Sequence, residues 1–143
     1  MRKLLTPIIF FALFSCAKKT DTPAPLTAQQ KISSGPWKYK SIVFASPVMV
    51  KATGQYTTDG LIVEPCASDD QNTFNQNGTV LENDGVILCG STQIVTGNWS
   101  LVGNNQMLWD NNLYTITQND GNTLIIVLPA TASLPAITTT FAH

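Results

Sequence analysis

Residues 66–89, CASDDQNTFNQNGTVLENDGVILC, decide the fold, because two cysteines bracket two consecutive turn signals. Asn77-Gly78 and Asp84-Gly85 are dipeptides that accept positive φ at little cost, as tight hairpin turns require. Short runs of strand-forming residues flank each dipeptide, so the stretch predicts a β-meander. We expect strands at residues 71–75, 79–83 and 86–89, with inward-pointing side chains at Phe74, Val80 and Leu88.

Cys66 and Cys89 can be interpreted as a disulfide or as a metal or redox pair. No second thiol or histidine stands at ligand spacing from them, and an export signal described below implies an oxidising compartment. The disulfide interpretation is therefore preferred. Closing a loop of this size stabilises a fold by about 3 kcal/mol on the chain-entropy model.

The strand and turn pattern continues on both sides of this stretch. Trp37 and Tyr39 alternate with Lys38 and Lys40, which is typical of a strand with one solvated face. Ser46-Pro47 predicts a turn after this strand, and the apolar residues 61–63 lead into Pro65-Cys66. Further strands are predicted at residues 37–44, 48–56, 94–102, 106–109, 113–118, 123–128 and 136–141.

These segments predict an all-β domain over residues 35–143, with about eight to ten strands and turns roughly every eight residues. Such spacing favours antiparallel neighbours, and a sheet of this many strands must curl or leave an exposed edge. A small up-and-down β-barrel is the expected closure, because about eight strands enclose a space that side chains or one small ligand can fill. A two-layer sandwich is the alternative architecture.

Residues 1–15 are predicted to be a secretory signal peptide. Arg2 and Lys3 precede an apolar run at residues 4–14, which matches a signal core and is too short to span a bilayer. The sequence Leu13-Phe14-Ser15-Cys16 resembles the bacterial lipoprotein lipobox, although Phe14 is larger than the usual residue at its position.

That resemblance implies lipidation of Cys16 and anchoring to a membrane of the bacterial cell envelope. Two or three acyl chains hold a protein on a membrane stably, whereas a single chain binds only marginally. Lipidation would also account for the odd third cysteine of an exported chain. The alternative is a soluble exported protein with an unpaired thiol.

Residues 16–34 are expected to form a lipid-anchored tether that ends in a short helix. The first part, AKKTDTPAPLT at residues 17–27, is small, charged and proline-containing, with nothing periodic to bury. Thr27 and Gln30 have the spacing of a capping box, which predicts one helical turn at residues 28–33 before Gly35-Pro36. This turn is expected to close one end of the domain.

The charge distribution argues against nucleic acid as a partner. The chain has 143 residues, 12% of them charged, and no lysine or arginine follows Lys51. Without the signal peptide, six basic side chains remain against nine acidic ones. Affinity for a phosphate backbone depends on basic side chains, and no basic stripe is present.

Four segments together resemble the lipocalin-like lipoprotein domains common in bacteria of the Bacteroidetes group. The similarity covers about residue 35 to the C-terminus and implies a calyx-like barrel without catalytic machinery or cofactor. Residues 51–63 depart from the usual pattern, because the second strand and its loop look longer. The segments are Gly35-Pro36-Trp37-Lys38, residues 66–79, Gly97-Asn98-Trp99-Ser100-Leu101 and Asn122-Thr123-Leu124.

Neither catalysis nor metal binding is indicated. The sole histidine, His143, stands at the chain end, where residues are often frayed, and no nucleophile, zinc or phosphate-loop motif is present. A calcium cluster is conceivable because several carboxylates surround the meander, but they fit no EF-hand loop, and an Asp beside a turn more often accepts hydrogen bonds from backbone N–H groups. Those carboxylates are Asp69, Asp70, Glu82 and Asp84.

Two functional hypotheses follow from the sequence. The first is a membrane-anchored, non-catalytic barrel that binds a small apolar ligand. The second is a filled barrel whose loops bind another envelope protein or inhibit a protease. Aromatic residues at strand spacing are more often core than ligand contacts, but five of them are candidates for lining a pocket. They are Trp37, Tyr39, Trp99, Trp109 and Tyr114.

Overall fold

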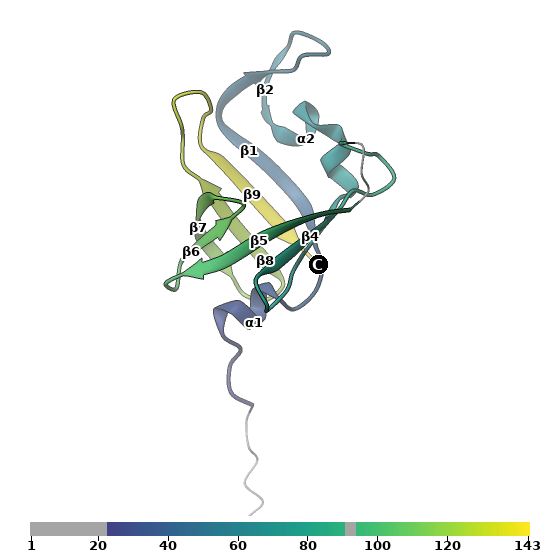
Figure 1. The fold of residues 1–143 in the computed structure, drawn as a ribbon. Coiled ribbons are helices and arrows are strands. Elements are labelled where there is room, and N and C mark those ends of the chain that lie inside the picture. Colours follow the sequence, from purple (N-terminus) through teal and green to yellow (C-terminus); the bar gives the residue numbers. More distant parts are fainter. Residues whose placement is uncertain (1–22, 91–93) are drawn as a thin grey trace, which may run out of the picture.

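Eight antiparallel strands close into a barrel in the computed structural model, which describes residues 23–90 and 94–143 (Figure 1). A ninth strand, β2, lies outside the closed ring, and the helical segments are short. The elements in chain order are α1 (Ala28–Ile32), β1 (Trp37–Met49), β2 (Tyr56–Asp59), α2 (Gly60–Val63), the 3₁₀ helix η1 (Pro65–Asp69), β3 (Gln71–Phe74), β4 (Thr79–Asn83), β5 (Ile94–Val102), β6 (Gln106–Trp109), β7 (Asn112–Asn119), β8 (Thr123–Leu128) and β9 (Ile137–Ala142).

The strands from β3 to β9 pair with their neighbours in chain order, and β9 returns to pair with β1. The second half of β1 also pairs with β2. The ring is joined between β1 and β3 by only two residue pairs, Trp37 with Asn72 and Lys38 with Gln71. The predicted all-β, antiparallel, up-and-down barrel is therefore confirmed, and the sandwich alternative is wrong.

Inward-facing side chains fill the end of the barrel nearest α1. Alternation along the strands selects them, as in β8, where Leu124 and Ile126 are buried and their neighbours are less so. Burying one large apolar side chain of this kind contributes about 1.5 to 3 kcal/mol. The buried cluster comprises Ile32, Trp37, Phe74, Val80, Trp99, Met107, Trp109, Leu124, Ile126 and Phe141.

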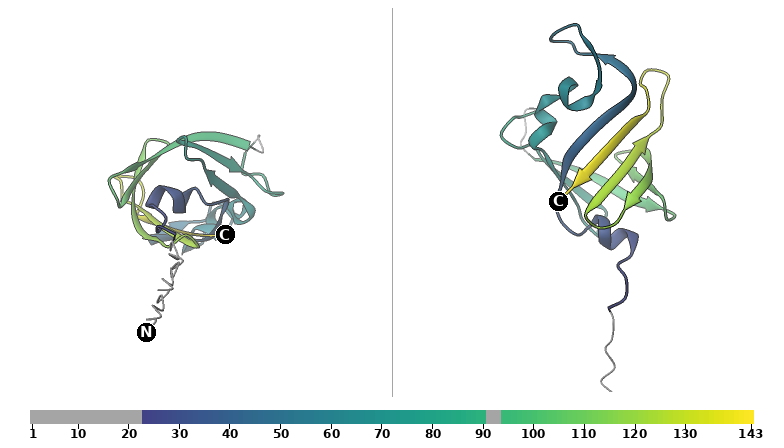
Figure 2. Two further views of the ribbon diagram at one scale, coloured as in Figure 1. Left: turned by 90° about the horizontal axis from the view of Figure 1, so that it is seen from below. Right: turned by 180° about the vertical axis from the view of Figure 1, so that it is seen from behind.

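The helix α1 lies across this end of the barrel (Figure 2, left). Its predicted capping box is confirmed, since the side chains of Thr27 and Gln30 each bond to the other's backbone N–H. Ile32 is completely buried, and its carbonyl accepts a 2.6 Å hydrogen bond from the indole Nε1 of Trp37. The Asn119 amide in turn donates to the Ala28 carbonyl at 3.0 Å. These contacts close one end of the barrel.

The region between the first two strands differs from the prediction. Ser46-Pro47 does not turn the chain, because β1 continues to Met49 and the turn follows it, with Gly54 at φ 70°. Proline is tolerated there because the pairing of β1 with β9 ends at Phe44, so no strand on that side needs the missing N–H. The pairing of β1 with β2 is irregular over the same segment.

Residues 61–63 are helical, and no helix was predicted for this apolar run. The carboxylate of Asp59 accepts a 2.9 Å hydrogen bond from the backbone N–H of Leu61 and so caps α2. Pro65 then begins η1, where proline costs no hydrogen bond at the first turn of a helix. The long region after Lys51 thus includes the short helical segments α2 and η1, which lie beside β1 (Figure 1).

Only one of the two predicted hairpin turns near the disulfide exists. Asn77-Gly78 turns β3 into β4, with Gly78 at φ 88°, and both strands are confirmed. Residues 86–89 are not a strand, because carboxylates take up their backbone N–H groups. Leu88, predicted to point inward, is 51% exposed, whereas Phe74 and Val80 are buried as predicted.

The C-terminal residue is fixed rather than frayed. The His143 imidazole Nδ1 donates to the Pro36 carbonyl at 3.0 Å, and Nε2 lies 2.9 Å from the Ser34 hydroxyl. These contacts place His143 beside α1 and the start of β1.

Candidate functional site

A cavity of about 320 Å³ lies at the end of the barrel opposite α1. Strand β1 forms one wall, β9 and the loop before it form the next, and α2 contributes the rim. The cavity is partly open to solvent, and its volume is within the range of about 300 to 1,000 Å³ typical of small-molecule sites. Its lining residues are Tyr39, Ile42, Phe44, Gly60, Glu64, Trp109, Tyr114, Leu128, Leu134, Ile137 and Thr139.

Three of the five aromatic residues singled out in the sequence line this cavity: Tyr39, Trp109 and Tyr114. The rings of Trp109 and Tyr114 lie 5.7 Å apart between centroids, and the ring of Tyr39 lies 4.8 Å from that of Phe141. Phe141 also contacts Trp109, with centroids 6.3 Å apart. The cavity therefore has an aromatic floor that rests on the packed core.

Trp37 and Trp99 do not line the cavity. Trp37 is completely buried under α1, where its indole bonds to Ile32. Trp99 packs edge-on against Phe74, and its Nε1 donates to the Asn75 carbonyl at 2.8 Å. Both indoles lie in the closed half of the barrel, so the structure brings three of the five candidates together and leaves two in the core.

A polar group that the sequence argument missed lies inside the barrel beside Tyr39. Asn72 on β3 is only 1% exposed, and neither its Oδ1 nor its Nδ2 has a hydrogen-bond partner at normal distance. Its amide is nevertheless close enough to the Tyr39 hydroxyl to lower the pKa of that phenol, although burial raises this pKa by more.

Glu82 on β4 carries a half-buried carboxylate that contacts Trp109. Its Oε1 accepts a 3.2 Å hydrogen bond from the indole Nε1 of Trp109. Desolvation is the main cause that raises the pKa of Glu82, and the nearby carboxylates of Asp110, Asp84 and Asp70 raise it further. Glu82 was singled out in the sequence only as a calcium candidate, although alternation along β4 puts it on the same inner face as Val80.

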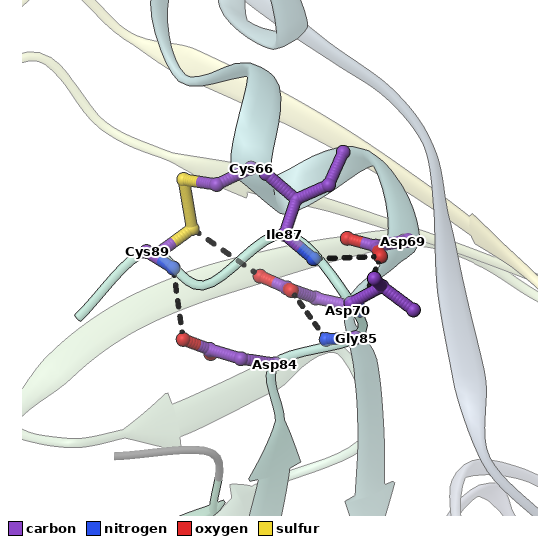
Figure 3. The surroundings of a disulfide bond; sticks show 8 residues. Cys66, Asp69, Asp70, Asp84, Gly85, Ile87 and Cys89 are labelled. Carbon is purple, nitrogen blue, oxygen red and sulfur yellow. Dashed lines mark hydrogen bonds between the residues drawn. A yellow bond between two sulfur atoms is a disulfide. The ribbon is translucent and has the colours of Figure 1, made fainter. Parts of the chain in front are cut away.

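The predicted disulfide between Cys66 and Cys89 is confirmed, and carboxylates surround it (Figure 3). Asp69 accepts hydrogen bonds from the backbone N–H groups of Val86 and Ile87 at 2.6 and 3.1 Å. Asp84 accepts a 3.0 Å bond from the N–H of Cys89 itself. The carboxylates and the disulfide therefore fix residues 84–89 against η1.

This arrangement favours the structural interpretation of the acidic residues. Asp70 accepts a hydrogen bond from the backbone N–H of Gly85 at 3.3 Å, and a Cβ at Gly85 would collide with the Asp69 carboxylate. Among residues 23–90 and 94–143, no group of three or more histidine, cysteine or acidic side chains is placed to hold a metal ion.

The predicted signal peptide and Cys16 lie outside the described residues. The structure therefore leaves the signal peptide and lipidation as predictions. In the part of the chain that the structure describes, no helix has the length and apolar content needed to cross a bilayer.

Comparison with known proteins adds no family assignment. No protein-family model matches the chain, and no curated protein matches it.

Proposed function

We propose that this protein is a non-catalytic, lipocalin-like lipoprotein that binds a small, predominantly apolar molecule. The observation that carries the proposal is the cavity in the open end of the barrel. Most of its lining side chains are aliphatic or aromatic, and such a site gains free energy by removing apolar ligand surface from water. The lipocalin-like resemblance of the sequence is consistent with this role.

The proposal includes an anchor at Cys16 in the bacterial cell envelope. It is motivated by the basic start, the apolar run and the lipobox-like residues before that cysteine. Metabolic labelling with a fatty acid, followed by replacement of Cys16 by serine, tests the anchor. Label that stays on the C16S protein, or its absence from the unmodified protein, would contradict lipidation.

Ligand binding is tested by narrowing the cavity from inside. Leu128→Trp and Ile137→Trp add bulk to two cavity walls, and Leu113→Trp adds the same bulk at an exposed position of β7. Native mass spectrometry and calorimetry with a panel of apolar molecules should detect binding to the unmodified protein and to L113W. The two cavity variants should not bind. The proposal would be rejected if the unmodified protein bound none of these molecules, or if L128W and I137W bound them as tightly as the unmodified protein does.

A second function, binding of another envelope protein, is favoured by one observation. Val86 is 93% exposed, and Ile87, Leu88 and Ile94 are also exposed on either side of the disulfide. Exposed apolar clusters of this kind frequently mark interaction sites. Cross-linking in intact cells should identify a partner at this surface, and Val86→Asp should abolish the cross-link without affecting small-molecule binding.

A further inference from the structure

Only one of the side chains that line the cavity carries a charge at neutral pH. That side chain is Glu64, which lies at the solvent-exposed rim, where water screens its charge. The described part of the chain contains four lysines and no arginine, and none of these lysines lines the cavity. They are Lys31, Lys38, Lys40 and Lys51. Within residues 23–90 and 94–143, the cavity interior therefore offers no counter-charge to an ionic ligand.

An ionic ligand would lose its hydration in this cavity without compensation. Moving an ion from water into an apolar site is costly unless a counter-charge or several hydrogen bonds replace the water. Glu82 does not supply this compensation, because it does not line the cavity and its Oε1 bonds to the indole of Trp109. The lining thus disfavours fatty-acid-like anions and organic cations alike, and it favours an uncharged ligand.

One hydroxyl of the lining is available to a polar atom of such a ligand. Tyr114 on β7 lines the cavity, and its hydroxyl has no hydrogen-bond partner in the part of the chain that the structure describes. The Tyr39 hydroxyl, by contrast, already contacts the Asn72 amide. The hydroxyl of Thr139 stays close to the backbone of β9, because the threonine side chain is short. Tyr114 is therefore the donor that reaches furthest toward a ligand.

The surroundings of Tyr114 keep its hydroxyl protonated and its ring in place. Desolvation raises the pKa of Tyr114, and the carboxylates of Glu82 and Asp110 raise it further, so the phenol is a hydrogen-bond donor at neutral pH. The ring packs beside that of Trp109, with centroids 5.7 Å apart. A ligand acceptor can thus replace water at a fixed, partly buried donor, which adds to affinity and to specificity.

The remaining lining limits the size of the ligand and makes most of its surface apolar. Ile42 and Phe44 on β1 face this space together with Leu128 on β8 and Ile137 on β9. The cavity volume is about 320 Å³, and a water molecule takes up about 30 Å³ in the liquid, so a ligand of about ten non-hydrogen atoms fills it.

We propose that the cavity binds an uncharged, predominantly apolar molecule with a hydrogen-bond acceptor, such as a ketone, an ester or an ether, and that the Tyr114 hydroxyl donates to this acceptor. This inference rests on the proposed ligand-binding function. It specifies the chemical class of the ligand and a residue that determines specificity.

Four probes of nearly identical shape test the inference. Acetophenone, isopropylbenzene, benzoate and benzamidinium each carry one phenyl ring and have the same number of non-hydrogen atoms, but they differ in charge and in hydrogen bonding. Each is titrated into the unmodified protein near neutral pH, with calorimetry as the readout. We expect acetophenone and isopropylbenzene to bind, and both ions to bind at least about tenfold more weakly than acetophenone.

Tyr114→Phe is the decisive variant, because it removes the hydroxyl and keeps the ring in the cavity floor. It should weaken acetophenone binding by about three- to tenfold without weakening isopropylbenzene binding. Tyr56→Phe provides the matched control, since it removes the same hydroxyl from a side chain on β2 that is 70% exposed and does not line the cavity. This control should leave both affinities unchanged.

The outcomes separate this inference from the proposed function. If benzoate or benzamidinium binds as tightly as acetophenone, or if Y114F binds acetophenone as tightly as the unmodified protein does, the inference is wrong while the apolar site stands. The inference is also wrong if none of the four probes binds. If the panel of apolar molecules fails as well, the proposed function is rejected together with it.

Discussion

The imidazole of His143 stacks on the indole of Trp37, with ring centroids 3.9 Å apart and an angle of 29° between the planes. The last residue of the chain therefore covers the first residue of β1 at the closed end of the barrel. Together with the bonds of His143 to Pro36 and Ser34, this stack joins the two ends of the domain.

Replacing His143 by alanine should lower the free energy of unfolding by about 1 kcal/mol, the usual contribution of an aromatic pair beyond its buried area. Urea denaturation followed by tryptophan fluorescence measures the change. His143→Phe keeps the ring and loses the hydrogen bonds, so its free energy of unfolding should lie between those of H143A and the unmodified protein. Equal stability of H143A and the unmodified protein would mean that the stack contributes nothing.

Removing both disulfide cysteines as Cys66→Ser and Cys89→Ser should cost about 3 kcal/mol of stability, because the bridge constrains the unfolded chain. Urea denaturation again provides the measurement. Reduction of the unmodified protein should give the same loss, whereas adding reductant to the double variant should change nothing. A fully reduced protein as stable as the oxidised one would contradict this expectation.

Gly78→Ala should destabilise the protein by about 1 to 2 kcal/mol, since an L-residue is strained at φ 88° and the new methyl approaches the Trp99 carbonyl. Gly90→Ala is the matched control, because no atom lies within 4 Å of a Cβ built there. The control should change stability by less than about 0.5 kcal/mol. Comparable losses in the two variants would argue against strain at the hairpin.

Glu82→Gln should stabilise the domain near neutral pH and lose this advantage in acid. The pKa of Glu82 is raised in the folded state, chiefly by desolvation and then by Asp110, Asp84 and Asp70, so the native protein binds its proton more readily than the unfolded chain does. The cost of ionising Glu82 is consequently absent below its unfolded pKa and appears as pH rises through the folded value.

Thermal unfolding of E82Q and the unmodified protein, measured between acidic and neutral pH, tests this difference. The two melting curves should approach each other as the pH falls below the ordinary glutamate range. A difference that grows on acidification would show that ionised Glu82 is stabilised in the fold.

The second half of the barrel was predictable because each turn is encoded by its own residues. The predicted segments 94–102, 106–109 and 123–128 are the observed β5, β6 and β8, and the segment for β7 was short by one residue at each end. Alternating polar and apolar residues separated by asparagine and glycine turns determine these strands locally.

The segments that the sequence did not predict depend on carboxylate side chains that bond to the backbone. Residues 86–89 look like a strand, but Asp69 binds their backbone N–H groups from η1. No helix was predicted at residues 61–63, but the Asp59 side chain starts one there. In both regions a carboxylate competes for backbone groups that strand pairing would otherwise use.

The residues that line the cavity could be predicted from the sequence only in part. Alternation indicates that Trp37, Tyr39, Trp99 and Trp109 point inward, but it does not give their height along the barrel axis. Which end of the barrel is packed and which end holds the cavity depends on closure of the ring and on the position of α1. Asn72 escaped notice because a polar residue in a short strand ordinarily indicates a solvated face.

Because α1 closes one end of the described barrel, the ligand proposed above is expected to enter at the opposite end, between α2 and the loop before β9. The rates at which this ligand enters and leaves then depend on the rim residues, while its affinity depends on the aromatic residues of the cavity floor. Substitutions at the exposed rim residues Glu64 and Leu134 should therefore change how quickly an occupant exchanges, largely independently of how tightly Tyr39 and Trp109 retain it.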